Sequence, residues 1–317
     1  MKNIKVLILL AFSSSVMGLE TDNFLGELNP PKDSSDVINK FVNSSIDEYL
    51  LKKESNLRSK GCSEVREKVL KSFRGWVVHA IEQYIDEQVS DDYLFPKRDH
   101  SYGDYFKKSI YYNRKIDLLK LKHLSRNINV NGIIIGSDKL SHFISTGIRY
   151  YYFYQSKIED GYSEQKALER AINYGVFTEK SVLGKLTSKV FSHADLEANY
   201  QGFLLNKEFC SEANPFVNFN GTWKRVRDFD IRNYVNPYWS EVFNPSYYTS
   251  WRWKMVKPII IKKYCSLNES NQIVSRLKKY SLFAEKSESV RYISRLEERG
   301  DLPDRTGQVM SMSCFNY

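Results

Sequence analysis

The sequence predicts a mainly α protein, with a helical bundle core and a loop-rich, aromatic-rich C-terminal segment. Apolar residues recur at helical spacing through much of residues 34–210. After residue 210 the chain becomes rich in Asn, Pro, Tyr and Trp and loses that spacing. A segment rich in aromatic residues is expected to be ordered, because disordered chains are poor in them. We therefore expect residues 211–317 to form an aromatic-rich segment and C-terminal helices packed on the core.

The N-terminus has the pattern of a secretory signal peptide. Lys2 and Lys5 precede a short apolar run at residues 6–12, and small residues follow it. Residues 1–18 are therefore predicted to be removed on export, so that the mature protein is periplasmic or secreted. No later stretch is long and apolar enough to span a bilayer. Residues 19–33 contain a Pro pair and little periodicity, and they are predicted to form an extended leader.

The charge pattern argues against a nucleic-acid-binding protein. The formal net charge of +9, less the two charges of Lys2 and Lys5, gives +7 for the mature chain. The remaining basic residues are interspersed with Asp and Glu, which is typical of solvated helix faces. Nucleic acid is therefore not an expected partner. The predicted export, rather than the charge, makes an envelope component or another envelope protein the expected partner.

Four cysteines lie far apart in the mature chain, without CxxC spacing. They are Cys62, Cys210, Cys265 and Cys314. An even number in an exported chain predicts two disulfides rather than a metal site, and the sequence leaves three connectivities open. We favour Cys210 with Cys265, because these residues bracket the irregular aromatic segment, which has most to gain from a covalent link.

Apolar periodicity and capping residues predict the helices. In the core they are expected within residues 34–53, 62–89, 104–124, 138–158, 163–175 and 193–206. In the C-terminal segment they are expected near residues 251–265, 269–284 and 286–299. The chain between residues 61 and 208 is thus predicted to be mostly helical.

The run "GSDKLSHF" places three ionisable residues at the start of the predicted helix 138–158. Asp138 and His142 are four residues apart and share a face, whereas Lys139 points to a neighbouring face. One interpretation is a helix start stabilised by Asp138 beside a hydrogen-bonded core histidine. The other is a functional polar site. The octet alone leaves both open.

A second polar pair occurs in "FSHADLEANYQGF", where Asp195 and Asn199 are also four residues apart. Ser192 can cap this helix, and capping then explains Asp195. It does not explain Asn199, a poor helix former in a mid-helix position. Gly202, about one turn later, allows a close backbone approach. If the two helices pack face to face, His142 should come within roughly 4–6 Å of Asp195 or Asn199.

Other polar residues give weaker signals. Glu179 follows an apolar stretch, and taken alone it is interpreted as an acid in a solvated loop or at a helix start. His79 and Glu82 form an HxxE pair that can ligate metal in a bundle core, but two ligands fall short of the usual three or four, which favours a structural role. His193 is expected to be exposed near a helix start. The chain has no GxSxG, HExxH, P-loop or GxGxxG motif.

The order of these motifs resembles the pattern D-K-x-x-H-F, Glu, S-x-x-D-L-x-x-N-x-x-G of the YfiM-like and VanZ-like bacterial cell-envelope proteins. The resemblance covers residues 132–208. The matching residues are Asp138, Lys139, His142 and Phe143 in the first motif, Glu179 as the intervening acid, and Ser192, Asp195, Asn199 and Gly202 in the last. The resemblance implies a helical core with a shared polar site formed by Asp138, Lys139, His142, Glu179, Asp195 and Asn199. It does not identify a reaction, a cofactor or a metal.

Two functions are consistent with these observations. The first is an exported, non-enzymatic envelope protein with a binding or structural role, in which the polar residues form a buried hydrogen-bond network. The alternative is a hydrolase acting on an envelope lipid or phosphoester. In it His142 would be the general base or a metal ligand, and Lys139 would stabilise negative charge. A sealed site favours the first function and an open cleft the second. The sequence leaves open whether the chain is an enzyme and whether it binds a metal.

Overall fold

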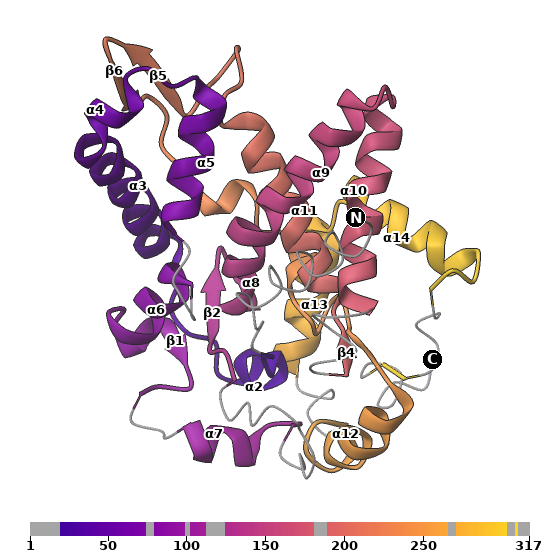
Figure 1. Ribbon diagram of the computed structural model, residues 1–317. Helices are drawn as coiled ribbons and strands as arrows, with labels where there is room; N and C mark the ends of the chain where they lie inside the picture. The colour runs from indigo at the N-terminus through magenta and orange to yellow at the C-terminus, as the bar shows by residue number, and fades with distance from the viewer. Residues whose placement is uncertain are drawn as a thin grey trace, which may run out of the picture.

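The computed structural model describes residues 20–73, 79–98, 102–111, 124–180, 189–265, 271–302 and 308–309. They form a mainly helical fold, as predicted (Figure 1). The α-helices are α2 (Asn23–Leu28), α3 (Ser35–Lys52), α4 (Glu54–Leu57), α5 (Cys62–Ser72), α6 (Ala80–Glu87), α7 (Tyr102–Lys108), α8 (Asp138–Ser141), α9 (Gly147–Glu159), α10 (Glu164–Lys180), α11 (His193–Glu208), α12 (Ser250–Lys263), α13 (Asn271–Phe283) and α14 (Glu288–Glu298). A π-helical turn, η2 (His142–Thr146), joins α8 to α9, and short 3-10 turns form η1 (Asp91–Tyr93), η3 (Ile231–Asn233) and η4 (Pro237–Trp239).

Short antiparallel strands interrupt the helices, and the sequence analysis did not predict them. They are β1 (Leu94–Phe95), β2 (Asn127–Val130), β3 (Ile133–Gly136), β4 (Val190–Phe191), β5 (Val217–Asn220), β6 (Thr222–Arg225) and β7 (Tyr247–Tyr248). β1, β2 and β3 form one sheet, β4 pairs with β7, and β5 pairs with β6. In the central hairpin, Ile128 lies opposite Ile135. Asn131 and Gly132 form its turn with φ of 52° and 83°, the backbone that favours Asn-Gly in tight hairpins.

Several predicted helices are present, but two are shorter than expected. The predicted helix at 138–158 corresponds to α8, η2 and α9, and those at 163–175 and 193–206 correspond to α10 and α11. The expected helix at 62–89 is not continuous, because α5 ends at Ser72 and α6 begins at Ala80. The expected helix at 104–124 begins as α7, and residues 112–123 lie outside the described part of the chain. The proposed signal peptide also lies outside it.

The segment predicted to be an extended leader contains α2 and is built into the core, so that prediction is wrong. Asp22 is fully buried; it accepts hydrogen bonds from the backbone N–H of Ile110 at 2.9 Å and from the hydroxyl of Tyr264 at 2.7 Å. The amide of Asn23 donates to the carbonyl of Ile134 at 3.1 Å. Periodicity gave no sign of this packing, because long-range hydrogen bonds rather than an apolar stripe hold the segment in place.

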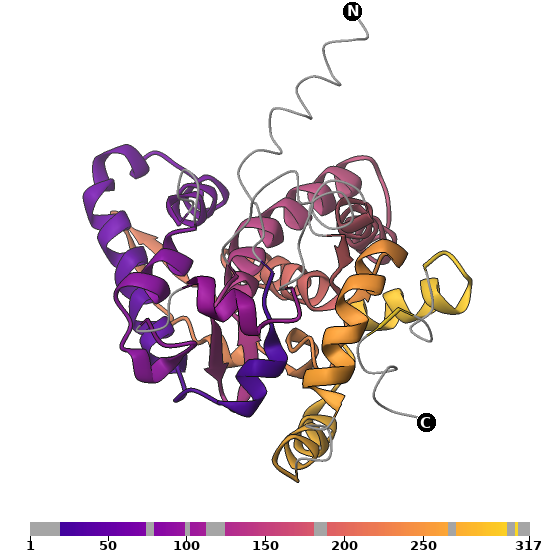
Figure 2. The same cartoon turned by 90° about the horizontal axis from the view of Figure 1, so that it is seen from below.

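Helices α9, α10 and α11 pack against one another beside the three-stranded sheet (Figure 1). The β5–β6 hairpin, from the aromatic-rich segment, contacts α3 and α4 at the opposite side. In the view from below, the indigo N-terminal helices and the yellow C-terminal helices lie at opposite ends of the molecule (Figure 2). The central helices that carry the polar motifs therefore lie between them.

Aromatic residues that follow Cys210 in the chain pack on Phe143, which belongs to the first polar motif. The ring of Phe143 lies 6.1 Å from Phe229, 5.2 Å from Tyr234 and 5.6 Å from Trp239, measured between ring centroids. Large aromatic side chains bury much apolar area and dominate core energetics. This packing fixes the turn of η2 on which His142 lies.

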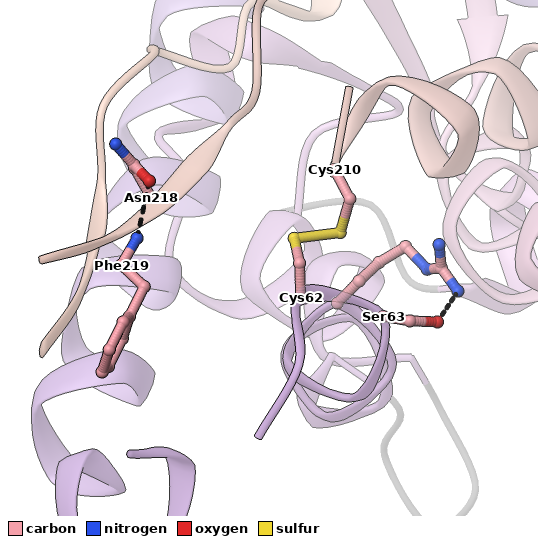
Figure 3. Close-up of a disulfide and its surroundings, with 6 residues drawn as sticks. Cys62, Ser63, Cys210, Asn218 and Phe219 are labelled. Carbon is pink, nitrogen blue, oxygen red and sulfur yellow. Dashed lines mark hydrogen bonds between the residues drawn. A yellow bond between two sulfur atoms is a disulfide. The ribbon is translucent and has the colours of Figure 1, made fainter. Parts of the chain in front are cut away.

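Cys62 and Cys210 form a disulfide, with their Cα atoms 5.9 Å apart (Figure 3). The prediction of at least one disulfide is confirmed, but the preferred pair of Cys210 with Cys265 is wrong. Cys210 lies just beyond the end of α11, and this end meets the start of α5 rather than the end of the aromatic segment. Cys265 is also disulfide-bonded. In the described ranges, no helix is both long enough and apolar enough to cross a membrane.

Candidate functional site

Lys139, on α8, lies at the centre of the predicted polar site. Its ammonium nitrogen is 2.7 Å from a carboxylate oxygen of each of Asp138, Asp195 and Glu241. The side chain is only 1% exposed. Burial disfavours a charged amine, but the three carboxylates outweigh it and hold the pKa of Lys139 well above its usual value. Lys139 is therefore a buried cation held by three acids.

Asp138 is positioned by the N-terminal segment. The hydroxyl of Thr21 donates to Oδ1 of Asp138 at 2.6 Å, while Oδ2 accepts from Lys139 at 2.7 Å. A Cβ at Gly136 would lie 2.1 Å from Oδ1 of Asp138 and 2.2 Å from Oγ1 of Thr21. The glycine at the end of β3 is thus what allows this contact. The carboxylate of Asp138 therefore lies at the start of α8 and also connects this helix to the N-terminal segment that contains Thr21.

His142 meets both polar residues of the second motif, as the helical spacing predicted. Its Nδ1 lies 3.1 Å from Oδ1 of Asn199, and its Nε2 lies 3.3 Å from Oδ2 of Asp195. Ser192 caps α11 by accepting the backbone N–H of Asp195 at 3.1 Å. The cap and the contact to His142 are both present, so Asp195 does more than stabilise a helix end.

Two glycines let the helices approach closely enough for these contacts. A Cβ at Gly202 of α11 would lie 1.7 Å from the carbonyl oxygen of Phe143, and one at Gly147 would lie 2.5 Å from Cα of Gly202. The predicted close approach at Gly202 is confirmed. The site also lies where α8 passes into the π-helical turn η2, a feature that is frequent at functional sites.

Glu179 reaches the same place from the last turn of α10, where the resemblance also put it. It is buried, so its interpretation as an acid of a solvated loop or a helix start is wrong. One ligand-type atom from each of His142, Glu179 and Asp195 lies within 4.8 Å of the others. Burial and the charge of Asp195 raise the pKa of Glu179 well above its usual value. For Asp195, burial alone would raise the pKa, but His142 and Lys139 hold it below its usual value.

The hydrogen bonds define which atom of His142 faces the acids. When Nδ1 donates its proton to Oδ1 of Asn199, the lone pair of Nε2 points towards the carboxylate of Asp195. A lone pair facing a carboxylate is unfavourable unless a proton or a metal ion lies between them. Fixing one ring nitrogen by hydrogen bonding so that the other can bind metal is how proteins orient histidine ligands.

Glu241 was missed by the sequence analysis, although it binds Lys139 directly. It lies in the aromatic-rich segment, 102 positions after Lys139. Burial raises its pKa to about 8, an effect that the charge of Lys139 opposes. Glu241 is the only Asp or Glu from residue 231 to residue 268. The sequence signal that could have identified Glu241 was its position as an isolated acid in an aromatic-rich stretch.

The other histidine motifs add no ligand atom to the group of His142, Glu179 and Asp195 in the part of the chain that the structure describes. Among the described residues, His79 and Glu82 do not belong to a metal-binding group, although Glu82 lies close enough to Asp138 and Lys139 for their charges to act on it. Glu82 is buried, which raises its pKa to about 8, and it bonds the side chain of Ser141. His193 is buried rather than exposed as predicted, because its ring nitrogens lie 2.9 Å from the carbonyl of Pro245 and 2.9 Å from Glu297.

Compared with known proteins, the chain matches no protein-family model, no curated protein and no solved structure. The likeness to YfiM-like and VanZ-like proteins therefore stays a prediction from motifs. The argument for function consequently depends on the geometry of the site.

Proposed function

We propose that this chain is an exported cell-envelope protein that binds one divalent transition-metal ion between His142, Glu179 and Asp195. The observation that supports this most is the approach of one nitrogen and two carboxylate ligand atoms to within 4.8 Å of one another. Histidine nitrogen and carboxylate oxygen are both zinc ligands in proteins, and a set of three protein ligands leaves a further coordination position for water. Asn199 would orient the histidine ligand.

The charge of the cluster also supports a cation. Four acids, Asp138, Glu179, Asp195 and Glu241, surround Lys139 and His142. The charge on Lys139 is already shared among three of them. Glu179 faces Asp195, and the basic groups beside this pair of acids are His142 and the already shared Lys139. Two buried like charges are stable only with a shared proton or a bound cation between them.

In this proposal the role of the metal is binding or structural. The ligands come from η2, α10 and α11, so an ion would join three separate elements of the central helical layer. The site residues are buried, with His142 3% and Glu179 2% exposed. A buried site favours a network that stabilises a binding surface for an envelope component or another envelope protein.

Metal analysis of the purified protein tests this proposal. Wild-type protein and His142→Ala would be incubated with Zn²⁺, desalted and measured by inductively coupled plasma mass spectrometry. We expect close to one zinc per wild-type chain and less than a tenth of that in His142→Ala. His79→Ala is the matched control, because it removes another buried histidine, and it should retain the zinc. Equal zinc in all three proteins, or none in the wild type, would contradict the proposal.

A hydrolase acting on an envelope lipid or phosphoester is the alternative. The observation in its favour is the ammonium group of Lys139, 2.7 Å from Asp195, which could stabilise negative charge next to a metal-bound water. Hydrolysis of bis(p-nitrophenyl) phosphate by zinc-loaded wild type, lost in His142→Ala and retained in His79→Ala, would favour this alternative. Metal binding without turnover would favour the structural role.

A further inference from the structure

Helix α12 has an exposed face on which apolar and basic side chains alternate. Figure 1 shows the helix at the bottom of the molecule, below the central helices α8 and α11 that carry the candidate site. Its buried side contains Val256 and Ile260, which are 1% and 0% exposed and belong to the core. The opposite face carries Trp251 and Ile261, which are 43% and 49% exposed. Two large apolar side chains are thus left on the solvent side of a helix that is already anchored.

The exposed residues of α12 form one stripe. At about 100° per residue, Trp251, Lys254, Pro258 and Ile261 fall on the same side of the helix. Lys257 and Lys262 then fall at its two edges. All six of these residues are exposed. The stripe therefore presents an apolar centre with lysines within it and on both sides.

The charged side chains of α12 and α13 are all basic. Neither α12 nor the next helix, α13, contains an Asp or a Glu. Within the described part of the chain, Lys254, Lys257 and Lys262 make no ion pair with an acid. This differs from the rest of the sequence, in which basic residues alternate with acids. The lysines are consequently available to an anionic partner.

We infer that the exposed face of α12 binds the surface of an anionic phospholipid bilayer. Helices that lie in the membrane interface combine lysines on the polar side with Trp and aliphatic residues that enter the headgroup boundary. Tryptophan is enriched at this depth because its ring is amphipathic. Nucleic acid is less favoured, since apolar Ile261 and Pro258 at the centre of the stripe would face phosphates. The chain would then lie on a membrane without spanning it.

Vesicle binding by the full chain tests this inference. Large vesicles of phosphatidylglycerol and phosphatidylcholine, or of phosphatidylcholine alone, would be sedimented with the protein. We expect binding only to the anionic vesicles, and weaker binding as salt is raised, because salt screens the lysines. The triple variant Lys254→Glu, Lys257→Glu, Lys262→Glu should bind at least a hundredfold more weakly, since each lysine near an anionic surface contributes substantially.

A charge-matched control separates this face from net charge. Lys52, Lys68 and Lys166 are exposed on α3, α5 and α10. Replacing these three by Glu changes the net charge equally and should weaken vesicle binding less than fivefold. The pair Trp251→Ser and Ile261→Ser should weaken it at least tenfold while the salt dependence persists. Circular dichroism melts would establish that all variants are folded.

Three outcomes would overturn the inference. The first is wild-type protein that fails to sediment with anionic vesicles. The second is a control triple variant that loses as much binding as the α12 triple variant. The third is sedimentation unaffected by the α12 substitutions while a DNA duplex binds through the same lysines.

Discussion

Nε2 of His142 lies 3.3 Å from Oδ2 of Asp195, across the interface between η2 and α11. On the other side of the ring, Nδ1 lies 3.1 Å from Asn199, which is one helical turn beyond Asp195. The histidine is thus held between two residues on one face of α11. The consequence is that the direction of Nε2 is fixed, and Glu179 offers a ligand atom within 4.8 Å of those of His142 and Asp195.

Removing Lys139 should destabilise the protein strongly. Lys139→Met deletes the cation that three carboxylates share and leaves buried acids without compensation. Breaking a buried ion pair from one side costs about 3–5 kcal/mol. Urea unfolding in the presence of EDTA measures the loss. The control is Lys68→Met at an exposed position on α5, which should change the free energy of unfolding by less than about 0.5 kcal/mol. An equally small effect of Lys139→Met would show that the buried network contributes little to stability.

Gly202→Ala should force α11 away from η2. The added methyl group would lie 1.7 Å from the carbonyl of Phe143, which belongs to the backbone and cannot rotate away. Overpacking of this kind costs about 1–3 kcal/mol and sometimes more. We expect a loss of at least about 2 kcal/mol in urea unfolding and a weaker zinc affinity. Gly61→Ala, where a Cβ meets no atom within 4 Å, is the control; equal effects of the two substitutions would contradict the close contact.

The helical part of this site was predictable because it depends on local spacing. Asp138 with His142, and Asp195 with Asn199, are each one turn apart, and α8, η2, α9 and α11 have that geometry. Ser192 was also identifiable as a cap from the sequence.

The remainder of the site depends on contacts between distant segments, which periodicity does not encode. Thr21 and Glu241 reach the cluster from segments that the sequence analysis assigned to a leader and to a separate aromatic region. The Asn131-Gly132 dipeptide was an available signal for the hairpin, because this pair is favoured in tight hairpin turns, but the sequence analysis did not use it. The burial of Glu179 follows from the packing of α10, so its surroundings were not visible in the sequence.

Stability should fall as pH rises from acidic to mildly basic values, and Glu82 should contribute to that fall. Its pKa is raised from 4.5 to about 8 in the folded protein. A raised carboxyl pKa means that the folded state binds the proton more tightly, so its contribution is full below pH 4.5 and is lost as pH rises to about 8. The pKa shift corresponds to a change in the free energy of unfolding on the order of 5 kcal/mol.

The variant Glu82→Gln tests this assignment. In urea unfolding with EDTA, wild-type protein should lose more stability between about pH 5 and pH 8.5 than Glu82→Gln does. Glu48→Gln, at an exposed position on α3, should keep the wild-type profile. Parallel profiles for wild type and Glu82→Gln would show that Glu82 is not protonated in the folded protein.

Loss of the disulfide between Cys62 and Cys210 should lower stability substantially. The bridge closes a loop with a sequence separation of 148, and long loops lose most entropy when they are closed. We expect the double variant Cys62→Ser, Cys210→Ser to be less stable by about 3–5 kcal/mol in urea unfolding. Peptide mapping without reduction checks the pairing. A peptide joining Cys210 to Cys265 would contradict the connectivity.

X-ray absorption at the zinc edge of the zinc-loaded protein tests the metal site most directly. The account predicts nitrogen and oxygen ligands only, at about 2.0–2.2 Å, with the outer-shell scattering of one imidazole. The same spectrum should be lost in Glu179→Gln, since that substitution removes a ligand charge from the cluster. Zinc bound by sulfur, zinc with two or more imidazoles, or a spectrum unchanged in Glu179→Gln would show that the ion binds elsewhere and that His142, Glu179 and Asp195 do not form its site.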